Sequence, residues 1–430
     1  MNYDEILSPG KKIKKIRKEL GLKQHEITGG EVTRNLISII ENDKATLTEK
    51  VAKVIVSNIN RACDERNIDF HVSIKYLLEN EELQAEKAVD KFLEKLSVDN
   101  LQVVDEIEEF LIIYDIGEKK RIIYEAIGDT YYEIRDYYKS YTYYIKAFVN
   151  IRKDKNKYII GELILKLSNC CKASNRYKDA LELYKLFLRE DSNIDIETKF
   201  RLLLDKAEIL MAIKEYDSAL DEIESIEEFS EELEGEYLFH LNMLKGLCFM
   251  KSKYYRDALE IYRNLKENLD LDNVSNRLYI NTKIIEIYIL LRDNRNIRKY
   301  IDECLESISS NRKLNNEEKG SEIFYGIAKG YKFIKENDVA LDYYNHCIYA
   351  AKRNKQINIL LKALENIFEI NEEENNIDEV ENIKNELLEL ISTKSINKEN
   401  TLIFKVISFY NCINDREGID GIISFILNSN

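Results

Sequence analysis

The chain has 430 residues, more than one ordinary hydrophobic core supports, and its formal net charge at pH 7 is −15. One proline, 14 glycines and little strand-like alternation favour an all-α protein. Because the sequence has no leader segment and no apolar run of about 18 residues, we expect a cytoplasmic protein that does not contact a membrane.

The charge is distributed unevenly along the chain. Residues 1–78 contain 14 Lys/Arg and 11 Asp/Glu, a net charge of +3, whereas the remaining residues have a net charge of −18. A basic head on an acidic body is typical of proteins that bind nucleic acid at one end only.

The basic part, residues 1–66, has the pattern of a small helical domain. Ser8 is expected to cap the first helix, since serine is a favoured N-cap residue. Pro9 follows it, and proline is tolerated at the first position of a helix. Turn signals at Gly21, at Gly29-Gly30 and around Asp43 separate the helices. We expect these helices over residues 11–20, 23–28, 32–41 and 48–66.

Two sequence blocks in this domain carry a family resemblance. They are Gly10-x5-Ile16-Arg17-x2-Leu20-x3-Gln24-x2-Ile27 and Val32-Thr33-Arg34-Asn35-x-Ile37-Ser38-x2-Glu41-Asn42-x-Lys44. Together they resemble the helix-turn-helix of phage repressors. The chain departs from that pattern in being one residue shorter between Gln24 and Glu41, with a double glycine that predicts a clipped second helix. Ile39 also stands where the pattern usually has a polar residue.

The resemblance implies that the third helix enters the major groove of double-stranded DNA by its N-terminal end. The residues expected to reach base edges are Thr33, Arg34, Asn35 and, one turn later, Ser38. Those expected to grip phosphates from helix ends are Lys23, Gln24, Asn42 and Lys44. The alternative is that Arg34 and Asn35 are ordinary solvated residues and the lysines of the first helix form a solvated face.

Residues 67–120 connect the head to the rest of the chain. Apolar residues at helical spacing predict amphipathic helices here, and no flexible Gly/Ser-rich tether is present. We expect these helices to dock on the following segment, either as a cap or as a degenerate repeat, and to make a rigid connection.

Residues 121–356 contain a repeated pattern with intervals of 39 to 43 residues. A small residue recurs where two helices cross, at Ser140, Ala180, Ala219, Ala258, Ile297 and Ala340. A second slot lies in the first helix of each pair, at Gly128, Ser168, Ala207, Gly246, Ile285 and Ala328. A third lies in the second helix, at Tyr144, Tyr184, Ile223, Tyr262, Ile301 and Tyr344. The pattern resembles the tetratricopeptide repeat, whose period is about 34 residues, and implies a right-handed α-solenoid with a concave face.

Residues 357–430 are expected to form degenerate repeats that cap the array, with helix pairs over 357–391 and 399–428. They carry several apolar residues: Ile403, Val406, Ile407, Phe409, Ile422, Ile423, Phe425 and Ile426. Two explanations remain open, contact with a second subunit and burial within the last hairpin.

A helix-turn-helix head followed by such an array resembles the peptide-pheromone regulators of Gram-positive bacteria, the RRNPP group. That resemblance implies a homodimeric quorum-sensing transcriptional regulator that binds a palindromic promoter site and is controlled by a short signalling peptide in the concave groove. Two alternatives are kept. One is a Rap-like protein that acts on a response regulator as a phosphatase or by sequestration, and the other is a repeat scaffold that binds no DNA.

A bound extended peptide needs partners for its backbone amides, and asparagine supplies both a donor and an acceptor. Asn242 and Asn281 occupy the same first-helix slot of successive repeats. The full set of peptide-binding candidates is Asn169, Arg201, His240, Asn242, Asn281, Lys329 and Asn366. The alternative is that these asparagines bond to local backbone or reflect biased composition.

The sequence gives no support for an enzyme. The four histidines are far apart, the seven cysteines show no paired or metal-binding spacing, and no phosphate-binding glycine loop occurs. We therefore expect no catalytic residues, no metal and no cofactor.

Overall fold

The computed structural model describes residues 5–114, 116–151, 157–190, 194–229, 235–270, 273–310 and 319–428. Within these ranges every element is an α-helix, as predicted for the fold class. The chain divides into two compact units, unit 1 over Met1–Lys214 and unit 2 over Glu215–Asn430. Among the described helices, none is long and apolar enough to cross a membrane.

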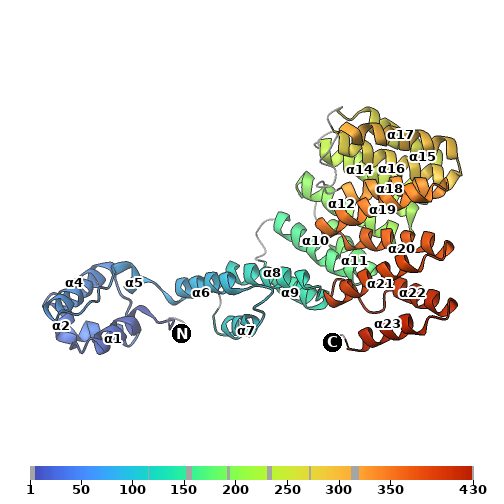
Figure 1. Cartoon of the computed structure of the whole chain (residues 1–430). Helices are drawn as coiled ribbons and strands as arrows, with labels where there is room; N and C mark the ends of the chain where they lie inside the picture. Colours follow the sequence, from blue (N-terminus) through green and yellow to red (C-terminus); the bar gives the residue numbers. More distant parts are fainter. Residues whose placement is uncertain are drawn as a thin grey trace. The chain divides into compact units, whose positions relative to one another are not determined.

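Unit 1 begins with the helices of the head (Figure 1). Their bounds are α1 Pro9–Glu19, α2 Gln24–Thr28, α3 Arg34–Glu41, α4 Glu49–Glu65 and α5 Ile74–Leu78. The first four agree with the sequence-based segments to within two residues. Ser8 caps α1 as expected, because its hydroxyl accepts a hydrogen bond from the Lys11 amide at 3.2 Å.

The clipped second helix is confirmed. α2 has five residues and ends at Gly29, where φ is 57°, and Gly30 follows with φ of 81°. A side chain at Gly29 would collide with Asn58 of α4, since a Cβ atom would lie 2.4 Å from its amide nitrogen. The double glycine therefore gives both the left-handed backbone and the space that α4 requires.

One hydrophobic core holds the head together. Ile13, Ile27, Ile37, Ile55 and Ile59 are all completely buried in it. Leu77 of α5 belongs to the same core, although its position falls in the segment expected to connect the two parts of the chain.

Two further helices, α6 Glu81–Lys95 and α7 Val103–Ile113, follow the head. Their apolar residues share a second core with Ile123, Tyr124 and Ile127 of the first repeat helix, α8 Glu118–Glu133. These helices therefore dock on the array, as predicted. The backbone amide and carbonyl of Leu7, just before α1, are both bonded to the Gln84 side chain of α6, at 3.2 and 2.8 Å.

Each repeat consists of a first helix, a tight turn and a second helix. In unit 1 these helices are α8 Glu118–Glu133, α9 Tyr137–Val149, α10 Lys157–Ala173, α11 Tyr177–Glu190 and α12 Ile196–Ala212. In unit 2 they are α13 Tyr216–Glu227, α14 Gly235–Lys251, α15 Tyr255–Glu267, α16 Val274–Leu291, α17 Asn294–Ser310, α18 Gly320–Phe333, α19 Asn337–Arg353, α20 Ile357–Glu373, α21 Ile377–Ser392, α22 Thr401–Cys412 and α23 Arg416–Asn428. The two degenerate pairs expected after residue 356 are α20–α21 and α22–α23.

The repeat register predicted from the sequence is confirmed by burial. The three slots hold eighteen residues, and the sixteen that are not glycine, Ile297 included, are 2% exposed or less. The two glycines pack against tyrosine rings. A Cβ atom at Gly128 would lie 2.5 Å from the Tyr144 ring, and one at Gly246 would lie 2.6 Å from the Tyr262 ring. The small residues are needed because the aromatic side chain of the second helix lies directly on the first helix.

A left-handed residue marks the turn within each repeat. The positions with positive φ that follow the first helices are Arg135, Asn175, Lys214, Lys253, Arg292, Lys335, Asn375 and Asn414. A non-glycine residue with positive φ is uncommon, so its regular recurrence shows that one turn geometry is repeated along the array. The interval is 39 or 40 residues except between Arg292 and Lys335, where it is 43.

The last hairpin of unit 2 is partly exposed. Ile403, Val406, Phe409 and Ile422 are buried within it, whereas Ile423 is 44% exposed. Phe404 and Leu427, which were not singled out from the sequence, are 55% and 75% exposed. Burial explains the first four of these residues, and contact with a second subunit stays a prediction for the exposed ones.

Candidate functional site

The N-terminal turn of α3 presents polar side chains to solvent. Thr33 is its N-cap, since the hydroxyl accepts a hydrogen bond from the Leu36 amide at 3.3 Å. Arg34 and Asn35 follow and are exposed. Among the described residues, neither has a carboxylate partner, and the Asn35 amide forms no hydrogen bond. Both are therefore available to an external partner.

A chain of hydrogen bonds, which starts at the buried Glu41 carboxylate, supports this turn. The Arg17 guanidinium donates to the two carboxylate oxygens of Glu41, and Glu41 is 2% exposed. Gln24 donates its amide to the same carboxylate at 2.9 Å, and its amide oxygen accepts from Arg34 Nε at 3.4 Å. The side chain of Arg34 is thus held beside α2 by a network anchored in the core.

The residues expected to contact phosphates divide into two groups. Lys23 and Lys44 are exposed and, within the described part of the chain, form no ion pair. Gln24 is instead committed to Glu41, and the Asn42 side chain is bonded to Lys14 and to the Ser38 carbonyl, at 3.0 and 2.7 Å. Gln24 is half-buried, whereas Asn42 is exposed although its side chain makes internal bonds.

Other residues of the head also depart from the sequence pattern. Ser38 and Ile39 are both half-buried on α3. The lysine-rich first helix does not present all of its cations to solvent, because Lys12 is 1% exposed and Arg17 is paired with Glu41. The exposed cations of α1 are Lys11, Lys15 and Lys18.

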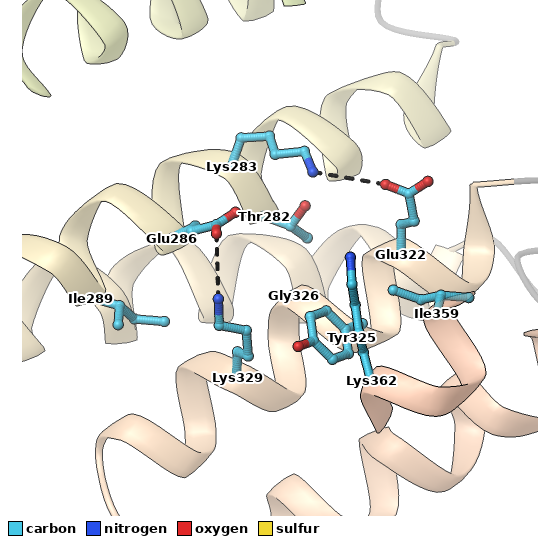
Figure 2. Close-up of a pocket in the computed structure, with 10 residues that line it drawn as sticks. All are labelled: Thr282, Lys283, Glu286, Ile289, Glu322, Tyr325, Gly326, Lys329, Ile359 and Lys362. Atoms are coloured by element: carbon cyan, nitrogen blue, oxygen red, sulfur yellow. Dashed lines mark hydrogen bonds and ion pairs between the residues drawn. The ribbon is translucent and has the colours of Figure 1, made fainter. Parts of the chain in front are cut away.

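In unit 2, the first helices of successive repeats lie side by side, α16 against α18 and α18 against α20. A pocket of about 290 Å³ opens between these three helices (Figure 2). Gly326 of α18 packs against Thr282 of α16, since a Cβ atom at Gly326 would lie 2.4 Å from the Thr282 side chain. The charged and hydroxyl-bearing side chains that line the pocket are Thr282, Lys283, Glu286, Glu322, Tyr325, Lys329 and Lys362.

Ion pairs fix four of these side chains. Lys329 donates to Glu286 at 3.4 Å, and Lys283 lies 3.7 Å from Glu322. Burial acts to raise the pKa of Glu286, but Lys329, Lys283 and Lys251 outweigh it, so the pKa lies below its usual range and the carboxylate stays charged. Lys362 is exposed and, among the described residues, has no ion pair.

Tyr325 adds a hydrogen-bond donor to the same pocket. Burial is the main cause that raises its pKa, to about 12, so the hydroxyl remains protonated at neutral pH. Asn366 donates its amide to the hydroxyl oxygen at 3.2 Å. The hydroxyl hydrogen is therefore directed to a different acceptor.

The structure brings together two of the peptide-binding candidates. Lys329 lines the pocket and Asn366 contacts it through Tyr325. His240 is exposed beside a separate hollow of about 460 Å³ between α14 and the start of α16. Asn169 and Arg201 belong to unit 1. Asn169 is half-buried, and Arg201 of α12 is paired with Glu162 of α10.

Two asparagines predicted to line the groove make internal contacts instead. Asn281 is 3% exposed, and its amide interacts with Cys304 of α17, so its burial contradicts the groove-lining placement. Asn242 is half-buried and donates to the carbonyl of Leu238, one turn earlier in its own helix, at 2.8 Å. That bond matches the alternative of local backbone satisfaction.

Lys283, Glu286, Glu322, Tyr325 and Lys362 were not identified from the sequence. The spacing from the left-handed turn residues could have identified one of them, Glu286. Glu286 and Lys329 each stand six residues before a left-handed turn residue, so they share one register position and face one another on adjacent helices. Asn169 occupies the same position in unit 1.

No protein-family model matches the chain, and no curated protein matches it in sequence. Solved structures of helical-repeat proteins do show similarity. The apo form of the quorum sensor NprR from B. thuringiensis is 15% identical over 81% of this chain and 99% of its own, with a TM-score of 0.46. PlcR of Bacillus thuringiensis, in complex with the peptide PapR7 and DNA, is 15% identical over 60% of this chain and 92% of its own, with a TM-score of 0.32.

A Rap protein in complex with competence and sporulation factor is 12% identical over 98% of both chains, with a TM-score of 0.34. All three structures resemble this chain at low identity. The function of this chain has to be argued from its own residues.

Proposed function

We propose that this chain is a transcriptional regulator that binds double-stranded DNA through its helix-turn-helix head and is controlled by a short peptide bound on the first helices of its repeat array. The head supplies the DNA contacts, and the array supplies the regulatory site. The observation that carries the proposal is the exposed N-terminal turn of α3, in which Arg34 and Asn35 have no internal charge partner.

The chemistry of this turn suits base reading. A guanidinium pairs with the O6 and N7 acceptors of guanine, and a carboxamide pairs with the N6 and N7 positions of adenine. Thr33 keeps its hydroxyl hydrogen for a phosphate, since its oxygen already accepts from the Leu36 amide. Lys23 and Lys44 add unpaired positive charge on the same domain, which favours phosphate binding.

The pocket between α16, α18 and α20 supports peptide control. An extended peptide must replace the water that solvates its backbone, and this pocket offers fixed donors and acceptors from three helices. We also propose a homodimer that recognises a palindromic site. The exposed Phe404, Ile423 and Leu427 on the last hairpin are the candidate contacts with the second subunit.

The experiment that tests the DNA part is selection of duplexes from a randomised pool by the full-length chain, followed by fluorescence anisotropy with the selected and a scrambled duplex. We expect enrichment of a defined site, and Asn35→Ala should lose the preference for it while retaining the fold. Failure to enrich any site, together with equal affinity for all duplexes, would rule out sequence-specific regulation.

The experiment that tests the peptide part is retention of synthetic heptapeptides on the immobilised chain. Peptides retained by the native chain, eluted and identified, are then added to the DNA-binding assay. A retained peptide should change the affinity for the selected duplex, whereas a scrambled peptide should not. No retention of any peptide would remove this part of the proposal and leave the DNA part standing.

A further inference from the structure

The pocket between α16, α18 and α20 carries a local excess of positive charge. Lys283, Lys329 and Lys362 outnumber Glu286 and Glu322, giving one uncompensated cation. Unit 2 as a whole contains 27 Lys/Arg and 41 Asp/Glu, a net charge of −14. A cationic pocket in so acidic a unit does not follow from the general composition.

The uncompensated cation is Lys362. Figure 2 shows its side chain rising from α20 into the pocket without an ion pair, while the Lys283–Glu322 pair is drawn above its ammonium and the Lys329–Glu286 pair to the left. Lys329 and Lys283 cannot be recruited without exposing a carboxylate that they neutralise. Lys362 can bind an anion at no such cost.

Tyr325 lies beside Lys362 in the same pocket and has a hydroxyl hydrogen to donate. Asn366 fixes the orientation of this hydroxyl, because its amide occupies the oxygen from the other side at 3.2 Å and its own oxygen accepts from Lys332 at 3.0 Å. The Lys362 ammonium and the Tyr325 hydroxyl line the same pocket, so they offer two donors to an acceptor with negative charge.

We propose that this pocket binds a carboxylate group of the regulatory peptide, with Lys362 and Tyr325 as its direct partners. The inference rests on the proposed function, since it names the chemistry of the ligand at that site. A carboxylate has two oxygens, so one can accept from the Lys362 ammonium and the other from the Tyr325 hydroxyl. The carboxylate belongs either to an Asp or Glu side chain of the peptide or to its C-terminus.

The size of the site suits a short peptide. Packed helices lie about 8–10 Å apart, so three adjacent first helices span roughly 20 Å between their axes. An extended chain covers about 3.3 Å per residue, and about seven residues are needed for that distance. A heptapeptide can therefore cross all three helices and place one carboxylate at Lys362.

The test uses four pools of randomised heptapeptides on the immobilised full-length chain. Two pools contain Asp and Glu and two exclude them, and each kind is made with a free carboxylate and with an amide at the C-terminus. We expect the pool without any carboxylate to be depleted at least tenfold relative to the pool that has both. The two mixed pools identify the source: retention of the amidated acidic pool assigns the side chain, and retention of the free-ended neutral pool assigns the C-terminus.

Two charge-matched variants accompany the pools. Lys362→Gln should lower the affinity for individual retained peptides about tenfold, the loss expected for one charge-assisted hydrogen bond. Lys394→Gln removes an exposed lysine that follows α21 and does not line the pocket, and it should leave the affinity unchanged. Circular dichroism and thermal melting of both variants verify that the fold is intact.

The outcomes separate this inference from the proposed function. If the pool without carboxylates is retained as well as the others, or Lys362→Gln behaves like Lys394→Gln, peptide binding stands and the carboxylate site is wrong. If no pool is retained by the native chain, peptide control itself is wrong and the carboxylate site falls with it.

Discussion

Arg17 and Glu41 form a two-point ion pair inside the head, with Arg17 Nε 2.6 Å from one carboxylate oxygen and Nη2 3.0 Å from the other. The same guanidinium donates to the carbonyl of Leu22 at 3.0 Å. The pair thereby joins α1, the α1–α2 turn and the end of α3. Because Gln24 is bonded to the same carboxylate, the position of α3 relative to α2 depends on it.

Removing Arg17 should therefore loosen α3 specifically. Arg17→Ala leaves the buried Glu41 carboxylate without its cation, which typically costs about 3–5 kcal/mol. Hydrogen exchange of the full chain, followed by mass spectrometry, should show faster exchange in peptides from α1 to α3. Lys18→Ala is the matched control, since Lys18 is exposed on the same helix. Equal exchange in the two variants would contradict the role given to the pair.

The stability of the head should also depend on acid pH. Burial acts to raise the pKa of Glu41, but its bonds to Arg17 and Gln24 prevail and hold the pKa below its usual range. A carboxyl whose pKa is lowered by folding contributes stability that is complete above the unfolded pKa, about 4.3, and is lost as pH falls through the folded pKa. The protection of α1 to α3 against exchange, relative to the unfolded chain at the same pH, should fall over that acid range, and Glu41→Gln should flatten the profile.

Arg34 and Lys44 should affect DNA binding in different ways. If Arg34 reads a base edge, Arg34→Ala costs about 1–3 kcal/mol and relaxes specificity at one base position. If Lys44 contacts a phosphate, Lys44→Ala weakens binding to all sequences alike and lowers the slope of log affinity against log salt by about one. Anisotropy titrations with selected and scrambled duplexes at several salt concentrations measure both quantities. Identical behaviour of the two variants would refute the assignment of α3 as the recognition helix.

Two glycines of α14 provide a test of the repeat packing. A Cβ atom at Gly246 would lie 2.6 Å from the Tyr262 ring, whereas one at Gly235 would meet no atom within 4 Å. Gly246→Ala should destabilise the α14–α15 hairpin by about 1–3 kcal/mol through overpacking, offset in part by the better helix propensity of alanine. Gly235→Ala carries no such clash and should be neutral or stabilising. Thermal melting compares the two, and equal melting temperatures would show that the ring yields without cost.

The fold follows from the sequence because the repeat amplifies a weak local signal. A small residue opposite an aromatic one is unremarkable once, but at Gly128 with Tyr144 and again at Gly246 with Tyr262 it marks the same crossing of two helices. The double glycine of the head has a similar value, since it indicates where the backbone must turn left-handed. Both features involve residues that are close in the sequence, so the spacing of these residues is enough to predict them.

The side-chain partners within the sites could not be obtained in the same way. Gln24 has the position of a phosphate contact in the sequence, yet its amide is used by Glu41, 17 residues away. Lys362 carries no distinguishing neighbour in the chain, and only the packing of α20 beside α18 places it next to Tyr325. Such pairings depend on the distances between helices. These distances cannot be read from one sequence alone.

The joint between the head and the connecting helices depends on a buried lysine. Lys12 is 1% exposed, and its ammonium donates to the carbonyls of Tyr76 and Glu79 at 2.7 and 3.1 Å. It also lies 3.6 Å from the Glu79 carboxylate and 4.4 Å from the centre of the Tyr76 ring. A flexible tether would not need such a contact, so this lysine fixes α1 against the segment between α5 and α6.

Lys12→Met should therefore release this joint without unfolding α3. The change removes a donor from the carbonyls of Tyr76 and Glu79 and a cation from the Glu79 carboxylate. Gln84 still donates to the Glu79 carbonyl and Lys87 still pairs with its carboxylate, so we expect a loss of about 3 kcal/mol in local stability. Hydrogen exchange should accelerate in α5 and at the start of α6, while peptides from α3 keep their protection. Lys18→Met, on the exposed side of the same helix, should change neither. Unaltered exchange at α5 in the Lys12 variant would mean that the apolar contact of Leu77 alone holds the joint.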